Sequence, residues 1–427
     1  MRQEESGAME KWRELAVGRA KHSWLYAVTL MKWIAVGTLV GAAGGVVGTL
    51  FHLGVDRATE LREAHEWILY LLPVGGLLIT AIYRVTGTEG KGTNDIIRSV
   101  HFGSRIPFLL VPVIFVSTVI THLCGGSAGR EGAALQIGGG IGHKAGRLLR
   151  MNEQDLPLAT MCGMSGVFSA LFGTPLTAML FSLEVVSVGM LHYAGLIPCL
   201  TAALAGFWVS SAMGVPPTRF AIATLELLPV DMLRVAALAA LCAVVSIIFC
   251  RTLHAVEHAA EHFLKNAFLR SAVGGAVLIV LTLLVGTDYN GAGMGVIERA
   301  LSGEAGALAW VWKILFTAVT IGCGFKGGEV VPSFFIGAVF GCVVGPLLGL
   351  DAGFAAGIGL ICVFCGAVNC PLASIVLSAE LFGAGNLLYF AMACAISYLL
   401  SGYCGLYSSQ TIVYSKMRAE MVNRNPR

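Results

Sequence analysis

Long apolar runs, separated by short polar or glycine-rich stretches, dominate the pattern of residues along this chain. An α-helix needs about 20 mainly apolar residues to cross the hydrocarbon core of a bilayer. Runs near this length recur from one end of the sequence to the other, although several are short or broken by Gly or Pro. They predict an all-α polytopic membrane protein. The candidate spans are 25–52, 66–83, 107–124, 157–172, 174–213, 231–250, 272–286, 307–324, 332–349, 353–368, 371–383 and 386–402.

Composition supports this prediction. Of the 427 residues, 56% are hydrophobic and 12% are charged, with a mean hydropathy of +0.78. Soluble domains carry about 25% charged residues, so the lipid bilayer is the expected environment. The formal net charge is only +3, and no nucleic acid is expected as a partner.

Basic residues gather near both ends of the chain. Lys and Arg are enriched on the cytoplasmic side of membrane proteins, so we expect both termini in the cytoplasm and an even number of crossings. A charged stretch precedes the first apolar run, which argues against a cleavable signal peptide. We expect a multi-pass protein of the plasma (inner) membrane of a prokaryote. The terminal cations are Arg2, Lys11, Arg13, Arg19, Lys21, Lys32, Lys416, Arg418, Arg424 and Arg427.

Two halves of the chain repeat one plan. TPLTAMLFSLE matches CPLASIVLSAE, which aligns Glu184 with Glu380. Upstream, GREGAALQIGGGIG resembles GGEVVPSFFIGAVFG, with Glu131 opposite Glu329. Duplicated membrane halves are typical of transporters whose substrate site lies near the midplane, between the repeats. The residues alone leave open whether the repeats are inverted or parallel.

The most polar interior segment separates the two halves. We therefore predict five parts in chain order. They are a cytoplasmic N-terminal segment (1–23), a first membrane half (24–250), a polar linker (251–270), a second membrane half (271–415) and a cytoplasmic tail (416–427).

Each half contains a glycine-rich turn, at 125–132 and 322–328, before a segment that can begin a helix inside the membrane. Backbone N–H groups at such helix starts are unpaired and carry partial positive charge. Two converging starts would form an anion site without a buried Lys or Arg. Irregular backbone at this depth is tolerated where it is buried in protein or lines a cavity. Glu131 would compete with the anion for these donors, and because it can take a proton it can couple anion movement to proton movement.

These segments resemble the CLC family of chloride channels and anion/proton antiporters. GREGAALQIGGGIG is similar to that family's GREGP motif, and GGEVVP to its GxFxP motif. GTPLTAMLFSLE and the final GLYSSQTIVYSKMRAE are also similar to family segments. The likeness runs from about residue 30 to 420. It implies an inverted-topology repeat with broken, tilted helices, and a homodimer with one anion pathway in each subunit.

The departures from the family pattern indicate a particular branch. The family's GSGIP motif reads GKGTN here, so Lys91 replaces the serine and Asn94 the proline. Ala133 replaces the gate proline, and Glu329 stands at the bulky position of GxFxP. Val185 occupies the position of the internal proton-transfer glutamate of the chloride antiporters. Loss of the serine motif together with a glutamate in GGEVxP resembles the fluoride/proton antiporter branch, which implies fluoride export in exchange for protons.

The resemblance implies roles for individual residues. Glu131 is expected to be the gate and the proton carrier, and Glu329 a second acid at the anion site. Arg130 is expected to have a structural role near the gate. No cofactor and no metal are expected. Further anion contacts are expected from Gly132, Ala133, Val330, Val331 and Tyr407, with Lys91 and Gly92 as additional candidates.

Two alternatives remain open from the sequence. A chloride/proton antiporter, or a passive chloride or fluoride channel of the same family, is the first. The second is a membrane-associated zinc hydrolase, because HAVEH fits the H-x-x-E-H spacing of certain zinc peptidases. On a helix His254, His258 and His262 would share a face, as metal ligands do. The same segment is equally an ordinary polar helix between the halves.

Overall fold

The computed structural model describes residues 2–418 and 420–426, with residues 2–20 as backbone only. The side chains of Arg2, Lys11, Arg13 and Arg19, and all of Arg427, therefore lie outside the described part. The helices are α1 (Arg2–Ala64), α2 (Leu72–Val85), α3 (Thr93–Phe102), α4 (Leu110–Cys124), α5 (Glu131–Leu148), α6 (Leu156–Phe172), α7 (Pro175–Glu184), α8 (Leu196–Ala212), α9 (Pro229–Phe263), α10 (Ala267–Val285), α11 (Met294–Leu301), α12 (Ala309–Gly322), α13 (Val330–Val344), α14 (Ala352–Val368), α15 (Pro371–Phe382) and α16 (Leu387–Leu400). The strands are β1 (Ser187–Val188), β2 (Thr411–Tyr414) and β3 (Met421–Arg424).

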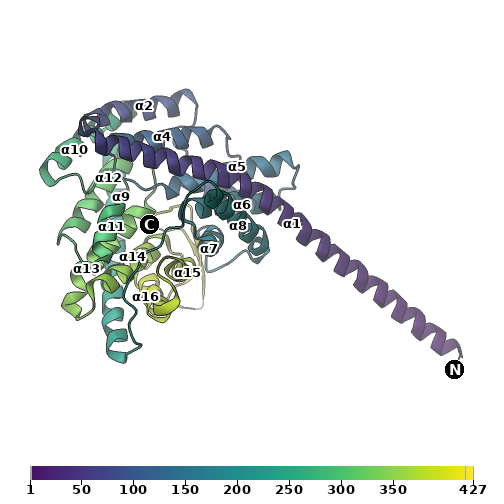
Figure 1. The fold of residues 1–427 in the computed structure, drawn as a ribbon. Coiled ribbons are helices and arrows are strands. Elements are labelled where there is room, and N and C mark those ends of the chain that lie inside the picture. Colours follow the sequence, from purple (N-terminus) through teal and green to yellow (C-terminus); the bar gives the residue numbers. More distant parts are fainter. Residues whose placement is uncertain (1, 419, 427) are drawn as a thin grey trace.

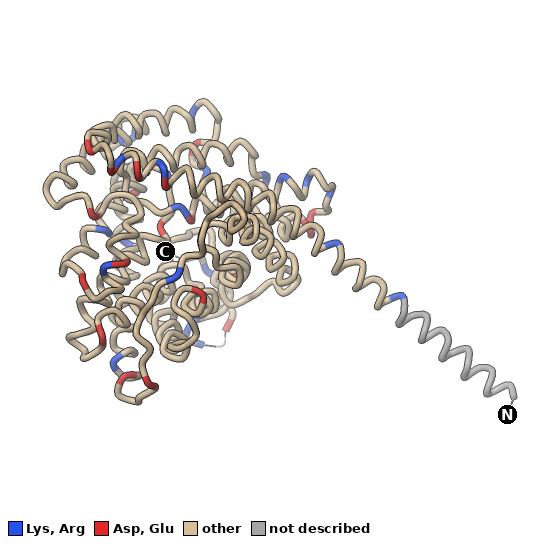
Figure 2. Tube along the Cα trace, in the orientation of Figure 1, with Lys and Arg blue, Asp and Glu red and all other residues tan. Residues whose placement is uncertain are grey.

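The helices form one body; the later part of α1 runs along it, whereas residues 21–32 of this helix project beyond it (Figure 1). Within the described residues, six helical segments are long and apolar enough to cross a membrane, and several shorter apolar helices accompany them. Figure 2 shows charged residues scattered between long stretches of uncharged chain. The predicted all-α membrane architecture with broken helices is confirmed.

Two segments divide differently from the prediction, one apolar run and the polar stretch between the halves. The run 174–213 is two helices, α7 and α8, because the chain leaves the helix after Glu184 and forms β1 before α8 begins. The polar stretch after residue 250 is mostly a continuation of α9, which is 35 residues long and ends at Phe263. Only Leu264–Asn266 separate it from α10, whose N-terminus is capped by the Asn266 side chain.

The end of the chain adds a small sheet that apolar periodicity did not predict. β2 pairs in parallel with β1 and antiparallel with β3, so the order is β1-β2-β3. The Gln410 side chain donates to the carbonyls of Val185 and Val368 at 3.0 and 2.9 Å. These contacts attach the last segment of the chain to both halves.

A pair of acids shows how the two repeats are related. Glu184, at the end of α7, accepts the N–H groups of Leu372 and Ala373 at the start of α15, at 3.2 and 2.9 Å. Glu380, in the last turn of α15, accepts the corresponding N–H groups at the start of α7, at 3.0 and 2.8 Å. Each carboxylate therefore caps the other repeat's helix, where a negative charge is favourable. This reciprocal contact is what an approximate two-fold axis between antiparallel α7 and α15 produces, so the repeats are inverted.

Glycines allow the central helices to pack closely in both halves. The position of a Cβ on Gly138 lies 2.3 Å from the carbonyl oxygen of Gly163, which joins α5 closely to α6. In the second half the corresponding position on Gly337 lies 2.2 Å from the carbonyl oxygen of Gly359, which joins α13 to α14. Both helices that carry the site described below are held by such contacts.

Gly138→Ala is expected to destabilise the protein. The added methyl would overlap backbone of α6, which cannot move aside as a flexible side chain can, and overpacking of this kind costs about 1–3 kcal/mol. Thermal unfolding in detergent, followed by tryptophan fluorescence, should show a lower midpoint than for the native chain. Gly306→Ala is the matched control, because its Cβ would make only an ordinary 3.7 Å contact. Equal midpoints for the two variants would contradict the close packing.

Candidate functional site

The starts of α5 and α13 meet at a two-residue bridge. Gly129 and Gly328 form an isolated antiparallel pair. The N–H of each donates to the carbonyl of the other, at 2.6 and 2.7 Å. The two glycine-rich turns predicted from the sequence therefore converge, as an anion site between helix starts requires.

The helix starts also correct the alignment of the two motifs. Glu131 is the first residue of α5, whereas Glu329 is the N-cap of α13 and corresponds to Arg130. The predicted match of Glu131 with Glu329 is displaced by one residue. The two acids consequently approach the site from different directions and are not symmetry mates.

Glu131 lies across the junction of the two halves and is fully buried. Its Oε2 accepts the N–H of Arg130 at 3.0 Å and the N–H of Val331 at 3.3 Å. The carboxylate of the first half thus occupies a donor at the start of the second half's helix. Its Oε1 is enclosed and has no hydrogen-bond partner among the described residues.

Glu329 lies beside the same helix start. One of its carboxylate oxygens, Oε2, is 3.3 Å from the position that a Cβ on Gly132 would occupy. This oxygen is enclosed and has no partner among the described residues. A buried carboxylate oxygen is normally hydrogen-bonded, so the free oxygens of Glu131 and Glu329 mark a place where a proton or a small ligand would be stabilised.

The predicted backbone donors are present at these helix starts. The first intrahelical bonds run from Ala134 N to Arg130 O in α5 and from Ser333 N to Glu329 O in α13. The N–H groups before them have no partner within their own helix. In this set Val331 donates to the Glu131 carboxylate. Four of the predicted contact residues carry such N–H groups, namely Gly132, Ala133, Val330 and Val331.

Tyr407 lies on the chain segment that follows α16. Its side chain is buried, and its hydroxyl has no partner among the described residues. The segment is fixed to the start of α3, because Asn94 Oδ1 accepts the N–H of Ser409 at 3.0 Å. The N-terminal turn of α3 in turn contacts α5, since Thr93 Oγ1 donates to Gly132 O at 3.3 Å.

Lys91 and Gly92 lie at the start of α3. The Lys91 ammonium pairs with Asp95 of the same helix at 3.2 Å, and its side chain is 43% exposed. Gly92 is the N-cap residue of α3, and its N–H donates to the Asp95 carboxylate. The Lys91 ammonium is therefore paired with Asp95, and no hydrogen bond or ion pair of the described residues joins Lys91 to Glu131 or Glu329.

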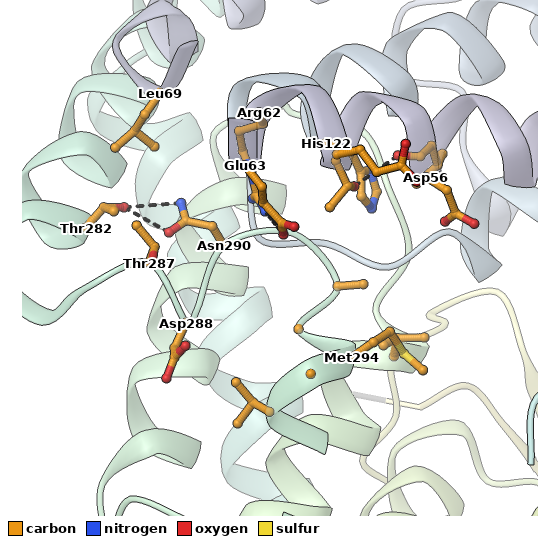
Figure 3. Close-up of a pocket in the computed structure, with 18 of the residues that line it drawn as sticks. Asp56, Arg62, Glu63, Leu69, His122, Thr282, Thr287, Asp288, Asn290 and Met294 are labelled. Carbon is orange, nitrogen blue, oxygen red and sulfur yellow. Dashed lines mark hydrogen bonds and ion pairs between the residues drawn. The ribbon is translucent and has the colours of Figure 1, made fainter. Parts of the chain in front are cut away.

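A cavity of about 970 Å³, called the vestibule here, lies between the end of α1, the end of α4 and the loop after α10 (Figure 3). Arg130 and Val331, the two residues whose N–H groups hold the Glu131 carboxylate, both line it. The Arg130 guanidinium donates to Asp56 at 2.9 Å, which ties the start of α5 to α1. Arg130 therefore lies directly before Glu131 and is held by α1; its structural role stays a prediction.

Sequence reasoning missed three cationic or protonatable groups around the vestibule. Arg62 and His122 line it, and the Lys313 ammonium is fully buried behind it, donating to Tyr289 O and Gly291 O at 3.1 and 2.8 Å. An ionisable residue inside an apolar segment is a signal of function by itself. Lys313 and His122 each carried that signal, in AWVWKILFTAV and VSTVITHLC.

The HAVEH segment does not form a zinc site in the described residues. His254 lies at 3.0 Å from Gly405 O, while His258 and His262 are exposed on α9. Within the described part of the chain, no three His, Cys, Asp or Glu side chains are placed to hold a metal ion. The zinc hydrolase alternative has no support from this geometry.

Comparison with known proteins agrees with this architecture. Residues 75–402 match the voltage gated chloride channel family. A chloride/fluoride channel protein of Pseudomonas syringae pv. tomato is 37% identical over 399 residues, covering 91% of this chain and 88% of the relative. The H(+)/Cl(-) exchange transporter ClcA of Vibrio campbellii is 24% identical over 396 residues, covering 83% and 82%.

Among solved structures, a CLC-type fluoride/proton antiporter superposes with a TM-score of 0.86 at 30% identity. The match covers 89% of this chain and 98% of that chain. The resemblance inferred from the motifs is therefore confirmed. The chain belongs to the voltage gated chloride channel family of multi-pass membrane proteins.

Proposed function

We propose that the protein is a fluoride/proton antiporter that exports fluoride in exchange for protons. The observation that carries this proposal is the second carboxylate, Glu329, beside the helix start that Glu131 contacts. Fluoride is a strong hydrogen-bond acceptor and the anion of a weak acid, so a protonated carboxyl group can donate a strong hydrogen bond to it. Chloride gains little from such a donor. The relatives named as chloride/fluoride channel protein and as fluoride/proton antiporter support the same choice.

The mechanism follows from competition for the same donors. The ionised Glu131 carboxylate accepts the N–H of Val331 and so excludes an anion from it. Once protonated, Glu131 loses its charge and releases the N–H groups of the two helix starts to fluoride. Protonated Glu329 then donates a hydrogen bond to the ion as the ion passes, and keeps its proton when the ion leaves. Tyr407, whose hydroxyl has no partner in the described residues, provides a donor on the inner side.

Orientation follows from the distribution of cations. We assign the N-terminal segment 1–23 and the tail 416–427 to the cytoplasm, with 251–270 joining the halves 24–250 and 271–415. The end of α1 then lies outside, and the vestibule lined by it opens outward. The protein is placed in the inner membrane of a prokaryote.

The functional unit is proposed to be a homodimer that needs no cofactor, metal or enzymatic step. Exposed apolar side chains on the helices related by the two-fold axis and on their neighbours offer a surface for the second copy. They are Leu176, Ile197, Leu372 and Leu388. Because each subunit contains both helix starts, each has its own anion pathway.

Ion flux from liposomes tests the proposed function. Purified protein is expected to give fast fluoride efflux, little chloride efflux and an opposing proton flux recorded as a change of external pH. Fluoride and chloride electrodes measure the two anions in parallel, and protein-free liposomes give the background. Chloride efflux equal to or faster than fluoride efflux would contradict the proposal and identify a chloride antiporter or channel. Fast fluoride efflux without proton flux would identify a passive fluoride channel.

A further inference from the structure

The vestibule contains hydrogen-bonding nitrogens that the gate does not use. Arg62 Nη1 and His122 Nε2 are enclosed and have no hydrogen-bond partner among the described residues. Both residues line the vestibule (Figure 3). Buried polar atoms are normally paired, so two unpaired nitrogens on side chains that line one cavity point to a ligand.

Arg62 lies in the last turn of α1, where its side chain is 12% exposed. One side of the guanidinium is satisfied, because Nη2 donates to Glu63 at 2.9 Å. Nη1 lies 3.3 Å from the position that a Cβ on Gly291 would occupy. The free donor therefore lies close to the loop that follows α10.

His122 lies in the last turn of α4 and is 1% exposed. Its Nδ1 is 2.9 Å from the carbonyl oxygen of Thr118. A carbonyl only accepts hydrogen bonds, so Nδ1 carries the hydrogen. In the neutral ring Nε2 then has a free lone pair, and protonation converts this nitrogen into a donor within the cavity.

Lys313 places a further positive charge behind the same loop. Its ammonium donates to Gly291 O at 2.8 Å, and Gly291 also adjoins Arg62 Nη1. Lys313 has no ion-pair partner among the described residues, whereas most of the acids that line the vestibule are paired with arginines. These pairs are Asp56 with Arg130, Glu63 with Arg62, Asp288 with Arg299, and Glu60 with Arg57.

We propose that Arg62 and His122 form a second, outer anion subsite that takes a small monovalent anion together with a proton on His122. The anion accepts hydrogen bonds from Arg62 Nη1 and from the protonated Nε2 of His122, and Lys313 acts on it through space. That the anion is fluoride, and that the subsite faces outward, rests on the proposed function.

Anion and proton support each other at this subsite. An anion beside His122 offsets the cations around the ring and favours its charged form, and the charged ring binds the anion more tightly. By linkage the two effects are equal in size. Outside the gate, an outgoing anion would therefore draw in the proton that Glu131 receives next. The cations that act on His122 are Arg130, Arg62 and Lys313. The other charged residues that line the vestibule with it are Asp56, Glu60, Glu63, Glu66, Asp288 and Arg299.

Anion binding to the full-length protein in detergent tests this inference without transport. Titration calorimetry with sodium fluoride and sodium chloride is run in the Glu131→Gln background, which removes the gate carboxyl. Wild-type His122 is expected to give tighter binding near pH 4.5 than near pH 7.5, because a low pH is needed to favour the protonated ring beside its neighbouring cations. His122→Leu should weaken binding at the lower pH about tenfold, as for the loss of one charge-assisted hydrogen bond.

Two further variants distinguish the subsite from a structural effect. His122→Gln should bind the anion without the pH dependence, because its amide donates at either pH. Arg62→Gln should weaken binding at both pH values, while Arg57→Gln, whose side chain is 82% exposed, should leave it unchanged. The inference fails if His122→Leu and His122→Gln both keep the wild-type pH dependence. This test measures binding and not flux. Its result is therefore independent of whether the liposome experiment shows fluoride/proton exchange.

Discussion

Glu131→Gln is expected to abolish proton flux while anion flux continues. The glutamine side chain has nearly the same shape, but its neutral amide holds the N–H groups of Arg130 and of Val331 more weakly than the carboxylate does, so an anion can displace it. It carries no charge and takes up no proton, so it resembles the protonated gate permanently. Proton movement coupled to fluoride should fall by roughly 100-fold or more, the size of effect expected when a group that transfers protons is removed.

The measurement is simultaneous recording of fluoride and of external pH from liposomes that contain the variant. Glu60→Gln is the matched control, because Glu60 also lines the vestibule but lies in an exposed ion pair with Arg57. The control should keep both fluxes. A Glu131→Gln protein that still exchanges protons for fluoride in the native ratio would remove Glu131 from its role as gate.

Much of the architecture could be predicted from the sequence because it depends on local patterns. Apolar runs identified most of the helices, and the match of Glu184 with Glu380 identified the repeat before their reciprocal caps were seen. Motif spacing also placed Glu131 and Glu329 near one site. The one-residue displacement between them could not be predicted, since it depends on which residue begins each helix.

The vestibule could not be predicted, for a different reason. Its lining comes from segments far apart in the chain, including the end of α1, the end of α4 and the loop after α10. Arg62, His122 and Lys313 lie in three separate segments, and no motif or regular spacing in the sequence connects them. Tertiary packing alone brings them together. The small sheet at the end of the chain was missed similarly, because its strands are two to four residues long.

Glu329→Gln is expected to reduce fluoride transport far more than chloride transport. Glu329 lies at the N-cap of α13, and its free Oε2 adjoins Gly132 at the start of α5. Both N-terminal dipoles favour an anion there, so an anion binds even without this carboxyl group. What glutamine removes is the exchangeable proton. Its amide N–H also donates, but more weakly than a carboxyl O–H, whose proton can shift toward fluoride and return to Glu329 when the ion leaves.

Fluoride turnover in liposomes should therefore fall at least about tenfold in Glu329→Gln, the lower end of what loss of a hydrogen bond to a charged partner costs. Chloride efflux from the same preparation is the internal control, and we expect it to change little or to rise. Glu304→Gln, at an exposed position before α12, controls for loss of a negative charge elsewhere. If Glu329→Gln lowers both anion fluxes equally, the residue supports the helix start and does not select fluoride. Unaltered fluoride turnover would remove Glu329 from the mechanism, and the competition at Glu131 alone would then have to explain the exchange.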